Sequence, residues 1–195
     1  MLSDLRSALR PALVLTLLFA LLLGIIYPLV LTGMGQALFP AQANGSLIRD
    51  GDRVIGSALI GQAFAGERYF HGRPSAAGAK GYDAAASAGS NLGPASKALA
   101  ERVRNDREAL AESAPGQPVP PDLVTTSASG LDPHISPQAA LYQVDRVARA
   151  RGLPAGQVRR LVETAIERRL LGFIGEPRVN VLALNRALDR LANGG

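Results

Sequence analysis

The chain has 195 residues, a formal net charge of +5 and no cysteine. This length suffices for one domain of ordinary size with an appendage. An exported part would have to fold without disulfides. The basic residues are interleaved with acidic ones rather than gathered into a stripe, which argues against nucleic acid as a partner.

The first long feature is an uncharged stretch, residues 11–48, in which Ala12 to Leu31 are almost wholly apolar. A helix of about twenty residues crosses a ~30 Å hydrocarbon core. A buried soluble helix is rarely apolar on every face over such a length. The small-residue run "AQA" at 41–43 would suit signal-peptide cleavage, but a signal core has only roughly 7–15 apolar residues. We therefore predict a retained membrane anchor.

The flanking charges predict the orientation of this anchor. Arg6 and Arg10 stand directly before it, and the next cation is Arg49. The positive-inside rule then places the N-terminus in the cytoplasm and the large domain outside. Pro28 is expected to kink the last turns of the helix. The predicted divisions are a cytoplasmic terminus (1–10), a transmembrane helix (11–38, core 12–31) and an extracytoplasmic, periplasmic domain (39–195).

The first third of the outer domain reads as a hairpin followed by a long loop. Asp50-Gly51-Asp52 between two short apolar runs predicts a β-hairpin. Residues 65–94 are rich in Gly, Ala and Ser, and loops of this length are usually functional or disordered. The aromatic residues and the Gly-Ser-Asn turn favour an ordered surface loop, in which His71 bonds locally. Apolar spacing then predicts a helix over 95–111.

The remaining elements predict an α+β domain. We expect a strand at 122–128, and a helix that begins at Ser136 with Pro137 in its first turn and closes at Gly152. A second helix is expected to begin near Val158 and to stop at Gly172. A last helix is expected after Asn180, which caps it.

Four residues in "TTSASGLDPH" have the chemistry of a hydrolase: Ser127, Ser129, Asp132 and His134. A nucleophilic triad is normally assembled from distant segments, and no G-x-S-x-G elbow occurs in the chain. Turn and capping bonds explain the same residues economically. A membrane-anchored exported hydrolase stays as the alternative function.

Neither a metal site nor a nucleotide loop is predicted. The two histidines, His71 and His134, have no paired spacing and there is no cysteine. The run "GSNLGPASK" at 89–97 lacks the order G-x-x-x-x-G-K-[ST] of a phosphate-binding loop. Gly33 and Gly35 would let a neighbouring helix approach the anchor closely. With these sites set aside, the sequence favours a subunit that binds other proteins.

Several motifs in order along the chain closely resemble one family. They include "YPLVLTGMGQALFPAQANGSLI", "YFHGRPSA", "GSNLGP", "TSASGLDPHISPQAALYQVDRVARARGL" and "GEPRVNVLALNRALD". The family is the C subunit of the Kdp-type potassium-transporting ATPase (KdpC). The resemblance implies a non-enzymatic accessory subunit of an ATP-driven potassium uptake complex in the bacterial inner membrane. Its implied partners are a channel-like potassium-binding subunit, a P-type ATPase subunit and membrane lipid.

The resemblance also implies a role as a catalytic chaperone that raises the ATP affinity of the ATPase subunit, with no tightly bound cofactor of its own. Gln143 matches the family glutamine proposed to contact this shared ATP. ATP is cytoplasmic, whereas the predicted topology places Gln143 outside, so we expect its help to be indirect. The docking surface is expected in loop 70–94, turn 125–134 and the anchor, at Gly33, Gly35, Phe70, His71, Arg73, Ser90, Asn91, Ser127, Ser129, Asp132 and His134.

Overall fold

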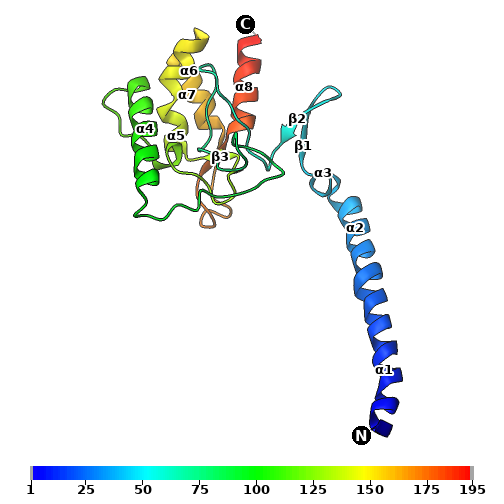
Figure 1. The fold of residues 1–195 in the computed structure, drawn as a ribbon. Coiled ribbons are helices and arrows are strands. Elements are labelled where there is room, and N and C mark those ends of the chain that lie inside the picture. Colours follow the sequence, from blue (N-terminus) through cyan, green and yellow to red (C-terminus); the bar gives the residue numbers. More distant parts are fainter. Residues whose placement is uncertain (1, 194–195) are drawn as a thin grey trace. The chain divides into compact units, whose positions relative to one another are not determined.

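A computed structural model describes residues 2–193 of the chain, which divides into two compact units between Leu47 and Ile48. The first is helical and the second mixes helices with short strands, so the predicted α+β class is confirmed (Figure 1).

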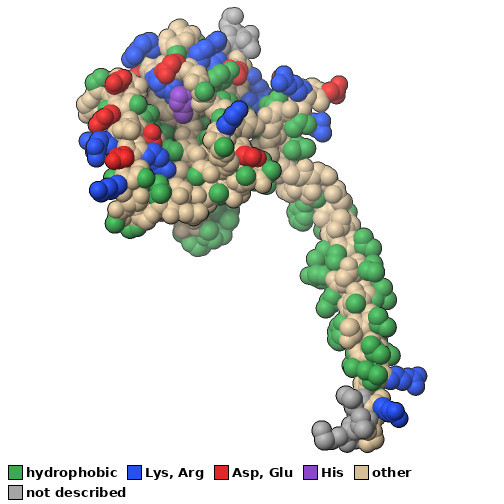
Figure 2. Space-filling model, in the orientation of Figure 1, with side chains coloured by type: hydrophobic (Ala, Val, Ile, Leu, Met, Phe, Trp, Pro, Cys, Tyr) green, Lys and Arg blue, Asp and Glu red, His purple; other side chains and the backbone are tan. Residues whose placement is uncertain are grey.

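The first unit is dominated by one long helix. Its parts are α1 (Leu2–Leu21), a π-helical turn η1 (Leu22–Ile26) and α2 (Tyr27–Leu38), followed by the short α3 (Pro40–Ala43). The segment Arg6–Leu38 is long and apolar enough to cross a membrane, and none of its most apolar window is buried. Figure 2 shows the apolar side chains along it.

The irregularity that we expected at Pro28 lies in the turn before it. Pro28 has no N–H, so the carbonyl of Gly24, four residues earlier, lacks its usual donor. A π-turn pairs each carbonyl with the residue five positions on, which suits a helix that has lost one i+4 donor. The consequence of the proline is therefore the π-turn Leu22–Ile26.

The second unit begins with the predicted hairpin. Strands β1 (Leu47–Asp50) and β2 (Arg53–Ser57) pair across the Asp-Gly turn, where Gly51 has φ +56°. Glycine adopts this left-handed backbone without steric cost. The hairpin prediction is confirmed.

Four helices and a three-stranded antiparallel sheet form the main body. The helices are α5 (Pro137–Tyr142), α6 (Val144–Arg151), α7 (Ala155–Thr164) and α8 (Val181–Asn193). The sheet has the order β3 (His134–Ile135), β5 (Arg178–Asn180), β4 (Ile166–Glu167). In register, Val179 lies opposite both Ile135 and Ile166, which directs apolar side chains of all three strands to one core.

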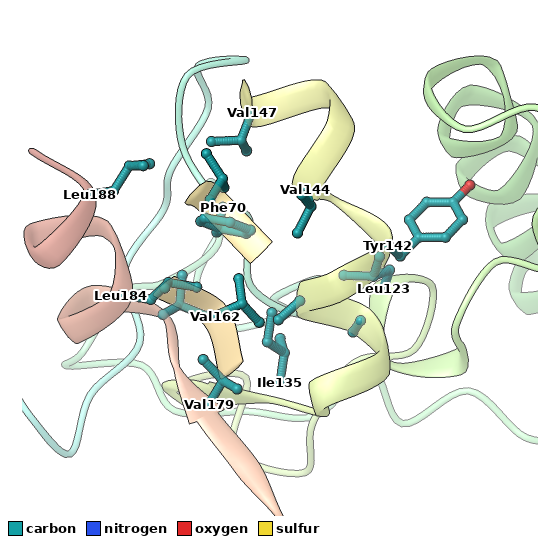
Figure 3. Close-up of a cluster of buried hydrophobic side chains, with 14 of the residues drawn as sticks. Phe70, Leu123, Ile135, Tyr142, Val144, Val147, Val162, Val179, Leu184 and Leu188 are labelled. Carbon is teal, nitrogen blue, oxygen red and sulfur yellow. The ribbon is translucent and has the colours of Figure 1, made fainter. Parts of the chain in front are cut away.

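Phe70 from the long loop fills the centre of this core (Figure 3). It is fully buried, although no helix or strand contains it. The side chains packed with it come from the helices and the sheet: Ile135, Val144, Val147, Val158, Val162, Val179, Leu184 and Leu188. Burying a phenylalanine contributes roughly 1.5–3 kcal/mol, so the loop is part of the folded core.

The predicted helix caps are confirmed. Ser136 Oγ accepts from the Ala139 N–H at 3.1 Å, and Pro137 occupies the first helical position. Gly152 ends α6 with φ +67°. Asn180 Oδ1 accepts from the Ala183 N–H at 3.0 Å. The earlier helix α4 (Lys97–Ser113) begins after Ser96, two residues later than predicted.

Three predictions of secondary structure were wrong. The expected strand 122–128 is a 3₁₀ turn η2 (Pro121–Leu123) followed by a loop, because the Thr125 hydroxyl bonds the Pro121 carbonyl at 2.8 Å. The helix expected to reach Gly172 ends at Thr164, because Ile166 and Glu167 pair with β5. The helix expected from Ser136 to Gly152 is divided at Gln143, where a tight turn separates α5 from α6.

Candidate docking surface

The chain enters the core at Phe70 and His71, directly after a largely exposed turn at residues 66–69, and side chains satisfy the backbone groups of these two residues. Asn185 on α8 accepts from the Phe70 N–H at 2.8 Å and donates to the Phe70 carbonyl at 2.9 Å. Gln143 repeats this pair at the next residue, accepting from the His71 N–H at 2.8 Å and donating to its carbonyl at 3.1 Å. Two amide side chains thus replace the neighbouring strand that such a segment would otherwise need.

The amide of Gln143 has no hydrogen-bonding capacity left. Besides both groups of His71, Oε1 accepts from Arg146 Nη2 at 2.7 Å and Nε2 donates to the Ala139 carbonyl at 3.2 Å. An amide side chain has two donor hydrogens and two acceptor lone pairs, and all are engaged. Only 2% of the residue is exposed. Within the domain, Gln143 therefore holds the His71 backbone in place.

Arg146 completes this buried polar cluster. Its guanidinium donates to the carbonyls of Glu67 at 2.8 Å and Tyr69 at 3.0 Å. The Glu67 carboxylate lies 3.7 Å away. Burial lowers the pKa of Arg146, and Glu67 opposes that change. Arg146 therefore binds three oxygen atoms at once: the carbonyl oxygens of Glu67 and Tyr69 and the side-chain oxygen of Gln143.

His71 bonds within its own loop, as predicted, with Nε2 3.0 Å from the Gly66 carbonyl. Burial lowers the pKa of His71, and the nearby Arg146 charge lowers it further. The bond to Gly66 and the Glu67 carboxylate oppose this change. Protonating His71 would bring a second cation next to Arg146 in a partly dry site.

Loop 70–94 and turn 125–134 form one surface, because Arg73 joins them. Its guanidinium donates to the Thr125 carbonyl at 3.3 Å, the Thr125 hydroxyl at 3.3 Å and the Thr126 carbonyl at 3.2 Å. Its other nitrogen lies 3.6 Å from Asp132 Oδ2. The planar fork of arginine suits such multiple acceptors.

Further bonds join the same two segments. The hydroxyl of Ser75 donates to the Gly130 carbonyl, while Tyr82 braces loop 70–94 internally by donating to the Arg73 carbonyl. The Ala88 N–H and the Ser87 hydroxyl both donate to the Ser129 carbonyl at 3.0 Å. The segments from Arg73 to Ala88 and from Thr125 to His134 are therefore bonded to each other along their length.

Gly130 is where the two segments approach most closely. It has φ +66°, and an added Cβ would lie 2.5 Å from the Ala88 carbonyl oxygen and 2.8 Å from the Ala77 nitrogen. Real Cβ atoms essentially never come this near to other heavy atoms. Only glycine fits this position without moving backbone.

The hydroxyl-rich turn does not assemble a catalytic triad. Asp132 and His134 are close, with Nδ1 to Oδ1 at 3.4 Å, but Asp132 also caps the turn by accepting from the His134 N–H at 3.0 Å. Ser127 and Ser129 face each other at 3.5 Å. Within residues 2–193, neither serine has a recorded bond to a histidine, so the hydrolase alternative is not favoured.

The predicted docking residues differ in exposure. Ser129 and Asn91 are exposed, and His71, Arg73, Ser90, Asp132 and His134 are half-buried. Phe70 is fully buried and Ser127 nearly so, so their side chains belong to the interior. Gly33 and Gly35 lie in α2 of the first unit. The surface available to a partner is thus the outer face of the two joined loops.

The sequence analysis did not identify four residues whose side chains hold this surface together: Asn185, Arg146, Ser75 and Tyr82. One of them had a usable signal, because Asn185 falls on the same helical face as Val181, Leu184 and Leu188. An amide on an apolar face indicates a buried hydrogen-bond partner. The other three had no comparable pattern, because their partners lie in loops.

The fold and this surface describe a small α+β domain that follows an apolar helix. Among known families, the sequence profile described as "K+-transporting ATPase, c chain" matches residues 9–190. The chain therefore belongs to this family. It is 62% identical over 184 residues to the potassium-transporting ATPase KdpC subunit of Caulobacter vibrioides, covering 94% of this chain and 93% of that protein.

Two further relatives carry the same name. The KdpC subunit of Methylorubrum extorquens is 58% identical over 197 residues, covering 95% of this chain and 98% of the relative. That of Bradyrhizobium diazoefficiens is 57% identical over 194 residues, covering 94% and 96%. The family resemblance stated from the motifs is confirmed.

Proposed function

We propose that the chain is a non-catalytic accessory subunit of an ATP-driven potassium uptake complex. In this proposal its helix Arg6–Leu38 spans the inner membrane once, with the N-terminus cytoplasmic and the second unit periplasmic. It stabilises the association of a channel-like potassium-binding subunit with a P-type ATPase subunit. Family membership over residues 9–190 and the apolar helix support this role.

One observation carries the docking part of the proposal: Arg73 joins loop 70–94 to turn 125–134 through three hydrogen bonds. A loop surface that is ordered before binding loses less conformational entropy when a partner docks. We place the contact with the channel-like subunit on the exposed face of these loops, including Asn91 and Ser129.

Co-purification of the three subunits tests this surface. Ser129→Arg and Asn91→Arg add bulk and charge at exposed positions, so they should lower the yield of the assembled complex without unfolding the chain. The matched control is Gln138→Arg on α5, which is also exposed and polar. Equal yields from all three variants would place the contact elsewhere.

The same proposal makes any effect on ATP affinity indirect. The amide of Gln143 is buried and fully bonded within the domain, which supports an architectural role. Protease digestion of spheroplasts and of inverted vesicles tests the required topology. Cleavage of the second unit only in spheroplasts is expected, and cleavage only in inverted vesicles would make direct ATP contact the better mechanism.

A further inference from the structure

The hairpin that connects β4 to β5 ends in an apolar tip, residues 170–174, whose large side chains are exposed. Leu171 is 76% exposed and Phe173 73%, with Leu170 at 66% and Ile174 at 48%. Figure 1 shows this hairpin at the lower edge of the second unit, and in Figure 2 apolar side chains gather there. Contiguous exposed apolar groups of this kind mark an interaction site.

Folding of the chain does not account for these side chains. Leu171 has φ +53°, a backbone conformation that costs an ordinary residue roughly 1–2 kcal/mol. A glycine or asparagine there would avoid most of this cost. The leucine also gains little burial in return, since three-quarters of it is exposed. Its apolar surface is useful only to something outside the chain.

The backbone of the tip is suited to a medium without water. Leu170 and Ile174 exchange both backbone hydrogen bonds, at 2.9 and 3.0 Å. The N–H of Gly172 donates to the Arg169 carbonyl at 3.1 Å, and that of Phe173 to the Leu170 carbonyl at 3.3 Å. Four of the five N–H groups are thus satisfied inside the loop, which lowers the cost of moving this backbone out of water.

Charge at the base of the tip complements a phospholipid surface. Arg169 pairs with Glu176 and Arg178 with Glu167, each at 2.8 Å. Arg168 has no ion-pair partner among residues 2–193, which leaves the base net positive. Apolar side chains at the end of a loop with arginines behind them match the acyl chains and the anionic headgroups of a bilayer.

A short link ties the second unit to the apolar helix. The long helix ends at Leu38 and the second unit begins at Ile48, so the linking chain spans at most about 35 Å. A protein partner would also be expected to find polar groups, since interfaces average one hydrogen bond per roughly 100–200 Å². Residues 170–174 have no polar side chain.

We propose that residues 170–174 insert into the headgroup and upper acyl region of the bilayer that holds the anchor, with Arg168 against anionic lipid phosphates. The insertion gives the second unit a contact with the membrane additional to the covalent link. This goes beyond the accessory role, and it holds for either orientation of the helix.

The absence of tryptophan from the chain provides a direct test. The full-length Phe173→Trp chain is reconstituted in vesicles of phosphatidylethanolamine and phosphatidylglycerol, where its fluorescence is the only indole signal. We expect strong quenching by lipids brominated on the acyl chains and weak quenching by aqueous iodide. The matched control is Leu59→Trp, an exposed leucine of the same unit (64%), which should behave oppositely.

Two additional variants separate lipid contact from folding. In the Phe173→Trp background, Arg168→Gln should reduce the ratio of inserted to withdrawn tip about fivefold, because one cation near an anionic surface contributes about 1 kcal/mol. Leu171→Gly should also reduce insertion while leaving thermal stability unchanged or higher, since it relieves the backbone at φ +53°.

Two results would overturn the proposal. One is an indole that iodide quenches and brominated lipid does not, which would place the tip in water. The other is a fluorophore, attached before assembly to a Phe173→Cys variant of this cysteine-free chain, that is shielded from both quenchers in the three-subunit complex, which would place the tip on a partner subunit. Neither result bears on whether Asn91 and Ser129 are needed for assembly, so the two proposals fail separately.

Discussion

The Gln143 amide and the His71 backbone form a closed pair, with Oε1 2.8 Å from the His71 nitrogen and Nε2 3.1 Å from its carbonyl oxygen. Asn185 forms the same pair with Phe70, one residue earlier, at 2.8 and 2.9 Å. The aromatic side chain of Phe70 can reach the centre of the core because these two amides satisfy the backbone that has to cross it. Specific side-chain bonding thus makes a loop residue part of the interior.

This relationship predicts that Gln143→Ala and Asn185→Ala destabilise the chain in the same way, with the larger loss for Gln143→Ala because Arg146 also loses an acceptor. Each leaves a backbone N–H and a carbonyl of the 67–71 segment unpaired, which should lower the free energy of unfolding by about 2–4 kcal/mol. Thermal unfolding of the full chain in detergent measures this. Asn185 is the matched control, because only Gln143 has been proposed to contact ATP.

The ATP affinity of the assembled complex then separates architecture from contact. If Gln143 acts by holding the loop, both variants should weaken the apparent ATP affinity in proportion to their loss of stability. A loss of ATP affinity confined to Gln143→Ala, although Asn185→Ala is also destabilised, would instead support a direct contact with the nucleotide.

A second prediction concerns the close approach at Gly130. Gly130→Ala should cost more than about 3 kcal/mol, because an unfavourable φ adds to a clash with two backbone segments. Gly116→Ala is the control: its φ is +78°, but nothing lies within 4 Å of an added Cβ, so only about 1–2 kcal/mol should be lost. Similar losses in denaturant unfolding would show that the loops can separate at Gly130 without cost.

A third prediction is a pH dependence of stability that is due to His71. Its pKa is lowered in the folded chain, whereas the unfolded chain has the ordinary value of 6.5. The unfolded state therefore binds the proton first, and stability falls as pH decreases below about 6.5 until the folded histidine is also protonated. The neighbouring Arg146 enlarges this loss and Glu67 reduces it.

His71→Gln removes the titrating group while keeping a side chain that can donate to the Gly66 carbonyl. The free energy of unfolding of this variant should therefore depend less on pH than that of the natural chain, between about pH 7 and pH 5. Denaturant titrations at several pH values measure the difference. Parallel curves for the two chains would assign the dependence to other groups.

Local chemistry made part of this fold predictable. Ser136 with Pro137, Gly152 and Asn180 each act on the backbone within three residues, so their caps could be inferred correctly. The length and apolar character of Arg6–Leu38 likewise follow from the sequence of that segment alone. Interactions between residues so close in the chain can be inferred from the sequence directly.

Features that depend on distant partners were not predictable in this way. Ile166 belongs to a strand only because Val179 lies opposite it, and its apolar spacing fits the preceding helix equally well. The buried backbone of Phe70 depends on Asn185, 115 residues later. The joining of the two loops by Arg73 spans 52 residues, and no spacing rule connects an arginine with two threonine carbonyls at that distance.

The last prediction concerns Asp132, which combines a turn cap with a partly exposed charge. Its Oδ1 accepts from the His134 N–H at 3.0 Å, and its Oδ2 lies 3.6 Å from Arg73, with both side chains about 30% exposed. Asp132→Asn retains an acceptor for the N–H and loses the ion pair, which at such exposure contributes about 0–1 kcal/mol.

Asp132→Ala also removes the acceptor and should lose roughly 1 kcal/mol more. A turn that works chiefly through its cap therefore gives stabilities in the order natural chain, Asp132→Asn, Asp132→Ala, with the larger step between the two variants. The apparent potassium affinity of the assembled complex should not change in Asp132→Asn. A weaker affinity in that variant, at unchanged assembly, would show that the Asp132 charge acts on the approaching ion and not only on the turn.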